Sequence, residues 1–83
     1  MDKSVASPAH RALAAMLREV RAERGMSQTE VARALGVPQS FVSKYESGVR
    51  RLDLVELHAL ASAFGTDLTA LVARFEEMIR HAG

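Results

Sequence analysis

The sequence predicts a compact all-α domain, and its composition, glycine spacing and helix-start signals each favour that class. Its apolar residues include 14 alanines and 9 leucines, against 8 valines, one isoleucine and no tryptophan. Alanine and leucine are strong helix formers, whereas strands are enriched in β-branched and aromatic residues. A length of 83 residues predicts one domain. Since its core is small and cysteine is absent, burial between two copies would add stability.

Three helices are predicted in the first part of the chain. The first, over residues 7–25, begins with serine and proline and ends at a glycine, which are typical start and stop signals. Ser27 and Glu30 form a capping-box pattern that starts a short helix over 27–36. A Val-Pro pair restarts the chain, and a second short helix follows over 37–48.

Two more helices are predicted in the second part. Asp53 and Glu56 have the spacing of another capping box, and this helix runs to Gly65. The last helix, over about 67–81, carries an apolar stripe at helical spacing. Its members are Leu68, Leu71, Val72, Phe75, Met78 and Ile79. We therefore expect a flexible N-terminal arm over residues 1–7 and a five-helix domain over residues 8–83.

Positive charge is concentrated in the middle of the chain. The net charge is only +1, but residues 18–51 carry seven Lys or Arg against four Glu. Residues 52–83 carry two Arg against five Asp or Glu. This imbalance fits either a solvated surface or a polyanion partner, so motifs must decide between them.

The sequence contains no motif for catalysis, metal binding or membrane insertion. His10, His58 and His81 fall on three predicted helices without metal-ligand spacing, and there is no Gly-x-Ser-x-Gly elbow or phosphate-binding glycine loop. We expect no enzyme activity, no cofactor and no metal. The first residues lack the apolar run of a signal peptide, and no stretch is apolar enough to cross a bilayer. The expected location is the cytoplasm, with no membrane partner.

Two short helices joined across Gly36 have the dimensions of a helix-turn-helix. Four runs lie in register between Leu17 and Val72: Leu-Arg-x-x-Arg-x-x-x-Gly-Met-Ser-Gln, Val-Ala-x-x-Leu-Gly-Val, Val-Ser-x-Tyr-Glu-x-Gly and Leu-x-x-Leu-Ala-x-Ala-Phe-Gly. In these runs the chain resembles the lambda-repressor-like helix-turn-helix regulators, the Cro/repressor-type or xenobiotic-response-element family. The resemblance implies binding to double-stranded DNA.

The resemblance also implies which residues read bases. The family's base-reading positions match Gln39, Ser40 and Lys44, with Ser43 a further contact. Gln can pair with adenine through two hydrogen bonds, Lys can donate to guanine, and Ser is permissive. Phe41 departs from the small or polar residue common there, so it either touches a thymine methyl group or packs.

Other positions are implied to hold the DNA backbone. Gln28, at the start of a helix, would bind a phosphate through its side chain and the helix N-terminus, and Arg50 and Arg51 match a basic loop that grips the backbone. Arg21 and Glu46 match a pair that locks the first helix to the third; the alternative is two independent surface charges.

We expect Tyr45 to be a core residue whose hydroxyl is directed outward.

The apolar stripe of the last helix continues beyond the end of the family's core helix. We expect a two-fold dimer interface there, formed by Leu71, Val72, Phe75, Met78 and Ile79. The alternative is that Phe75 to Ile79 pack on the first helix of the same chain. The sequence thus predicts a homodimeric transcriptional repressor of a palindromic operator. The alternative function is an antitoxin or another interaction module whose last helix binds a partner protein.

Overall fold

The computed structural model describes residues 7–82 and confirms the predicted all-α, five-helix fold. Residues 1–6 of the expected N-terminal arm, and residue 83, lie outside the described residues. No strand occurs between residues 7 and 82. The helices are α1 (Pro8–Glu23), α2 (Gln28–Leu35), α3 (Gln39–Glu46), α4 (Leu54–Ala63) and α5 (Leu68–Ala82).

The helices begin where local sequence signals predict. Ser7 caps α1, because its Oγ accepts a hydrogen bond from the backbone N–H of His10 at 3.0 Å. In α2, Ser27 Oγ accepts from the N–H of Glu30 at 3.1 Å, and Glu30 Oε1 accepts from the N–H of Ser27 at 2.7 Å. This reciprocal pair satisfies two N–H groups that have no partner within the helix.

The later helices start in the same way. Asp53 Oδ1 accepts from the N–H of Glu56 at 2.8 Å, and Glu56 Oε1 accepts from the N–H of Asp53 at 2.9 Å. At the start of α5, Asp67 Oδ1 accepts from the N–H of Ala70 at 2.8 Å. The caps that the sequence predicts at Ser7, Ser27 and Asp53 are therefore present as hydrogen bonds.

The core forms where one face of each helix turns inward. α1 contributes Met16, Leu17 and Val20, which are at most 3% exposed. Their i, i+1, i+4 spacing places them on one face of the helix. The other members of the buried cluster are Val31, Ala32, Val42, Tyr45, Leu60, Ala61, Phe64 and Leu71.

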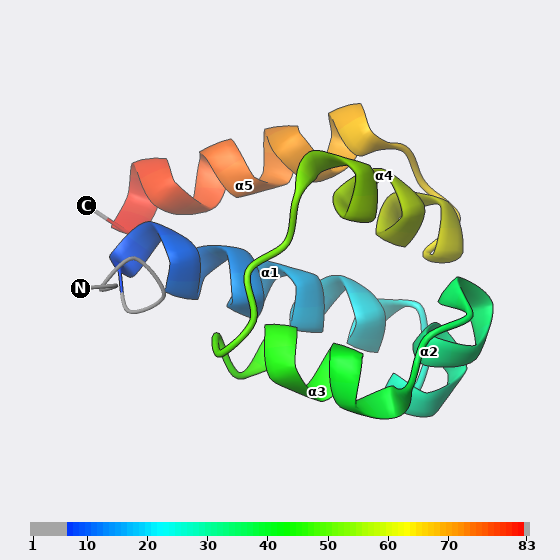
Figure 1. The fold of residues 1–83 in the computed structure, drawn as a ribbon. Helices are drawn as coiled ribbons and strands as arrows, with labels where there is room; N and C mark the ends of the chain where they lie inside the picture. Colours follow the sequence, from blue (N-terminus) through cyan, green and yellow to red (C-terminus); the bar gives the residue numbers. More distant parts are fainter. Residues whose placement is uncertain (1–6, 83) are drawn as a thin grey trace.

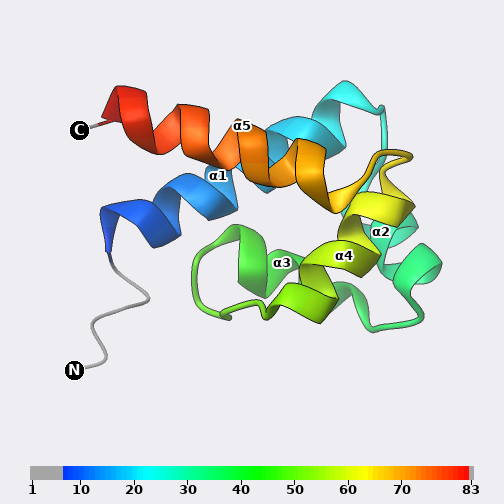
Figure 2. The same ribbon diagram turned by 90° about the horizontal axis from the view of Figure 1, so that it is seen from above.

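α1 is the central helix of the fold. It lies between α5 and α3 in Figure 1 and packs against both. α5 runs antiparallel to α1, with its C-terminal end near the start of α1, as Figures 1 and 2 both show. α2 packs against α3 and α4. The two short helices α2 and α3 therefore sit at one side of a scaffold formed by α1, α4 and α5.

An ion-pair cluster joins α5 to α1. Arg74 Nη1 donates to Glu23 Oε1 at 2.8 Å, and Arg74 also pairs with Glu23 Oε2 and, at 3.5 Å, with Glu19 Oε1. These hydrogen bonds raise the pKa of Arg74 and lower the pKa of Glu23.

Within residues 7–82, no helix combines the length and the apolar character that a membrane span requires.

Candidate nucleic-acid interface

A tight turn joins α2 to α3. Gly36 has φ 72° and ψ 33°, in the left-handed region that favours glycine, and its N–H donates to the carbonyl of Arg33 at 3.2 Å. The N–H of Val37 donates to the carbonyl of Ala32 at 3.0 Å. Pro38 then precedes α3 with an extended backbone, so the chain reverses within a few residues. The product is the helix–turn–helix arrangement that the sequence predicts.

One face of α3 is polar and open to solvent. Gln39, Ser40 and Lys44 are exposed, and Ser43 is half-buried beside them. The opposite face is buried through Val42, Tyr45 and Glu46. The four polar residues lie between one and five positions apart and span about 140° of the helix circumference, which places them on one side of the helix. The structure therefore brings all four sequence-predicted base-reading residues to one surface.

A chain of hydrogen bonds connects this surface to a buried ion pair. Arg21 Nε donates to Glu46 Oε2 at 2.6 Å and Nη2 donates to Glu46 Oε1 at 3.0 Å, while Nη1 donates to the carbonyl of Met26 at 2.8 Å. Gln28 Nε2 donates to Glu46 Oε1 at 2.9 Å, and Gln39 Nε2 donates to Gln28 Oε1 at 2.6 Å. The four side chains thus form one continuous network from α1 through α3 and α2 to the exposed face.

The ion pair within this network is well shielded. The side chain of Glu46 is 3% exposed and that of Arg21 is 17% exposed. The hydrogen bond to Glu46 raises the pKa of Arg21. The alternative of two independent surface charges does not describe this pair.

Arg50, just beyond α3, is also paired inside the chain. Its Nη1 and Nη2 donate to Glu56 Oε1 and Oε2 at 3.1 and 2.9 Å, and Nη1 donates to the carbonyl of Arg51 at 2.7 Å. Its guanidinium carbon lies 4.4 Å from the centre of the Phe41 ring. The ion pair raises the pKa of Arg50 and lowers that of Glu56. The resemblance implied a phosphate contact for Arg50, whereas in this structure Arg50 is paired with the carboxylate of Glu56. Arg51 is exposed.

Phe41 and Tyr45 are the aromatic residues of α3. Phe41 packs against the core, with its ring 5.8 Å from that of Tyr45 in an edge-to-face arrangement, so of its two alternatives the structure shows packing. The prediction that the Tyr45 hydroxyl points outward is wrong. That hydroxyl is buried, without a hydrogen-bond partner in the described part of the chain. The Tyr45 side chain lines a small gap together with side chains of α1 and of the α3–α4 connection, so its own chain covers it. Burial raises the pKa of Tyr45.

Comparison with known proteins identifies the family. A sequence model of the helix-turn-helix family matches residues 17–71, which include α2, the turn and α3. The chain belongs to the helix-turn-helix family. This match confirms the lambda-repressor-like resemblance, and the segment outside it comprises the start of α1 and most of α5.

Individual relatives agree with this assignment. An XRE-family like protein from Pseudomonas syringae pv. tomato is 42% identical, with a TM-score of 0.80 over 92% of this chain and 93% of that one. The cryptic phage CTXphi transcriptional repressor RstR of Vibrio cholerae is 33% identical over 76% of this chain. The helix-turn-helix chain spans 57% of the length of that repressor. The controller protein C.Esp1396I, solved as a tetramer with its natural 35 base-pair operator, shares the fold with a TM-score of 0.81, 18% identity and coverage of 88% and 96%.

The apolar stripe of α5 divides between core and surface in this helix-turn-helix protein. Leu71 is 3% exposed and belongs to the core of its own chain, so it offers no surface to a second copy. Phe75 and Met78 are half-buried against that core. Val72 is 43% exposed, and Ile79 is half-buried. The alternative in which Phe75 to Ile79 pack within their own chain therefore holds for Phe75 and Met78, because α5 lies along α1.

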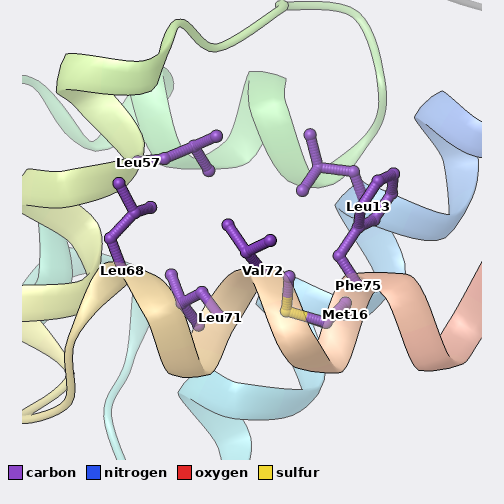
Figure 3. Close-up of a pocket in the computed structure, with 7 residues that line it drawn as sticks. All are labelled: Leu13, Met16, Leu57, Leu68, Leu71, Val72 and Phe75. Carbon is purple, nitrogen blue, oxygen red and sulfur yellow. The ribbon is translucent and has the colours of Figure 1, made fainter.

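A small apolar cavity of about 90 Å³ remains between α1, α4 and α5. Figure 3 shows Leu13, Leu57 and Val72 converging on it from these three helices. Its other lining residues are Met16, Leu68, Leu71 and Phe75. Because no polar group lines the cavity, it offers water no hydrogen-bond partner. The packing of α5 on its own chain is thus incomplete beside the exposed Val72.

Sequence reasoning missed the hydrogen bonds that join the Gln28 side chain to Glu46 and Gln39, and it missed the ion pairs of Arg50 and of Arg74. Glu56 lies six residues after Arg50 across a loop, and Glu23 lies 51 residues before Arg74. Neither separation follows a helical or strand period, so no sequence pattern could identify these partners.

Proposed function

We propose that this chain is a sequence-specific transcriptional regulator that inserts α3 into the major groove of double-stranded DNA. The observation that carries the proposal is the exposed polar face of α3 on a helix-turn-helix scaffold. The major groove admits one α-helix and displays a distinct hydrogen-bond pattern for each base pair. The exposed side chains of Gln39 and Ser40 can donate to and accept from such edges, and the ammonium group of Lys44 can donate to them.

Gln39 is the proposed reader of adenine. One N–H of its carboxamide donates to Gln28, which leaves the second N–H and the oxygen. A bidentate pair with adenine needs one donor and one acceptor, and these are the groups that remain. The bond to Gln28 restricts the rotation of the Gln39 amide before DNA arrives, which lowers the entropy lost on binding.

Lys44 is the proposed reader of guanine, and the start of α2 is the proposed phosphate anchor. Lys44 carries an exposed ammonium group on the same face, which can donate to the two acceptors of guanine. The first turn of α2, beginning at Gln28, has N–H groups without carbonyl partners inside the helix, and such groups favour a phosphate. The phosphate contact would position the protein on the DNA, and the Lys44 contact would read a base.

The relatives support regulation as the outcome of this binding. RstR is a transcriptional repressor, and C.Esp1396I was solved on its operator. Repression by occlusion of a promoter requires only a bound protein, so it suits a small domain.

A homodimer built on α5 would place two copies of α3 about 34 Å apart, one turn of DNA, on a palindromic operator. Val72 is the exposed apolar residue at the centre of the proposed contact, and the incompletely filled cavity lies beside it. Burying this region against a second copy would remove apolar surface from water and fill the mouth of the cavity.

Substitution of Val72 by Glu tests the dimer. We expect the wild-type chain to sediment as a dimer at micromolar concentration and V72E to sediment as a monomer, because a carboxylate would be desolvated at the contact. Val55→Glu is the matched control, since Val55 is 77% exposed on α4. A monomeric wild-type chain at high concentration, unchanged by DNA, would contradict the dimer and favour a surface for a different partner protein.

Selection of binding sites from random duplexes tests the proposed function. The purified chain should enrich one sequence with two inverted half-sites, because a two-fold dimer reads DNA symmetrically. Absence of any enriched sequence would refute sequence-specific DNA binding. Enrichment of single half-sites would retain the reading face and refute the dimer.

A further inference from the structure

Arg50 carries a charge that could contact a DNA phosphate, but most of its donors are already used within the chain. A guanidinium has five N–H donors. Three of them bind Glu56 and the carbonyl of Arg51. The ring of Phe41 covers one face of the group at 4.4 Å. The positive charge of Arg50 is therefore matched by a carboxylate before DNA binds.

The carboxylate that holds Arg50 is itself fixed in place. Glu56 Oε1 accepts from the N–H of Asp53 at 2.9 Å as part of the capping box that starts α4. This contact limits the freedom of Glu56 to turn away from Arg50. A carboxylate and a phosphate offer the same paired oxygens to a guanidinium fork, so the two ligands compete for one partner.

We propose that Glu56 sets the affinity of this chain for DNA by competing with backbone phosphate for the guanidinium of Arg50. The proposal rests on the DNA-binding function proposed above. The side chains of Arg50 and Glu56 are 39% and 29% exposed, so a phosphate can reach the pair and displace the carboxylate. Sequence-independent binding is mainly electrostatic. Glu56 therefore weakens binding to random DNA and leaves discrimination to the face of α3.

Replacement of Glu56 by Gln tests this competition. Gln also serves at the third position of a capping box, so α4 keeps its start and only the charge is lost. Binding of E56Q to a random duplex at low salt should be about three- to fivefold tighter, the range expected from a partly exposed ion pair. The slope of log K against log salt concentration should become steeper by about one unit, because one more phosphate is contacted.

Two further variants separate competition from a general effect of charge. Glu19→Gln removes the same charge from α1, where Glu19 lies 3.5 Å from Arg74 of α5 and outside the proposed DNA-binding residues. E19Q should change affinity less than E56Q and leave the salt slope unchanged. In the double variant R50A/E56Q the gain should disappear. Thermal unfolding of each variant checks that it is folded.

Three results would overturn the proposal. They are an unchanged or weaker affinity of E56Q, an equal gain in E19Q, and a gain in R50A/E56Q as large as in E56Q. Each of these leaves the proposed function intact, because the wild-type chain still binds DNA. A wild-type chain that binds no duplex at any salt concentration would refute the proposed function, and the competition with it.

Discussion

The buried side chain of Glu46 both stabilises the fold and supports the exposed polar face of α3. Its two oxygens accept hydrogen bonds from Arg21 and Gln28, and Gln28 in turn holds Gln39. A buried carboxylate with three hydrogen bonds is tolerated because its charge is paired and its oxygens are satisfied. The same residue therefore holds α1 against α3 and orients the first amide of the proposed reading face.

Substitution of Glu46 by Ala should lower the free energy of unfolding by about 3 kcal/mol, because it leaves the charge of Arg21 unpaired in a shielded site. Urea unfolding measures this loss. Glu77→Ala is the control: Glu77 pairs with Arg80 at the surface, where both side chains are about 60% exposed, and its loss should change stability by less than about 0.5 kcal/mol. Equal effects of the two substitutions would contradict the structural role of Glu46.

The positions at which the individual helices begin are set mainly by capping residues at their ends. The capping boxes at Ser27 and Asp53 are both present in the structure, and both could be read from three-residue spacings in the sequence. Such signals are local, so they do not depend on the rest of the fold. The Arg50–Glu56 and Arg74–Glu23 ion pairs are different, because their partners meet only after the helices have packed.

Substitution of Ser27 by Ala should destabilise the protein by about 1 kcal/mol, because the N–H of Glu30 at the start of α2 loses its acceptor. Ser62→Ala removes the same hydroxyl from an exposed position inside α4 and should be neutral or slightly stabilising, since alanine is the better helix former. Both values come from urea unfolding. A neutral S27A would show that the cap contributes nothing to the stability of α2.

At the scale of the whole molecule, the packing of α5 was the least predictable feature. The apolar stripe was correctly expected to be helical, but periodicity alone could not say whether its own chain or a second copy covers it. The structure buries Leu71 within the chain and leaves Val72 partly exposed. The ion pairs of Arg74 with Glu19 and Glu23 hold α5 against α1, and they join residues far apart in the sequence.

Stability should fall in acid as carboxylates lose their arginine partners. Hydrogen bonds to Arg74 and Arg50 lower the pKa of Glu23 and of Glu56 below the ordinary value of 4.5. A lowered pKa in the folded state adds stability that is fully present above about pH 5 and is lost as the pH falls through the folded-state pKa. Urea unfolding at pH 7, 5 and 3 should show this decrease.

Glu23→Gln should show a smaller decrease between pH 5 and pH 3 than the wild-type chain does. High salt should also reduce the decrease, because these pairs are partly exposed and therefore screened. A wild-type stability that does not change over this pH range would contradict a contribution from these pairs.

The most direct test of the account is the affinity of Lys44→Ala for the selected operator and for a random duplex of equal length. Lys44 is exposed on the proposed reading face and has no part in the buried network, so the variant should fold normally. We expect K44A to lose about tenfold or more on the operator and much less on the random duplex. An equal loss on both duplexes would contradict base reading by this face of α3.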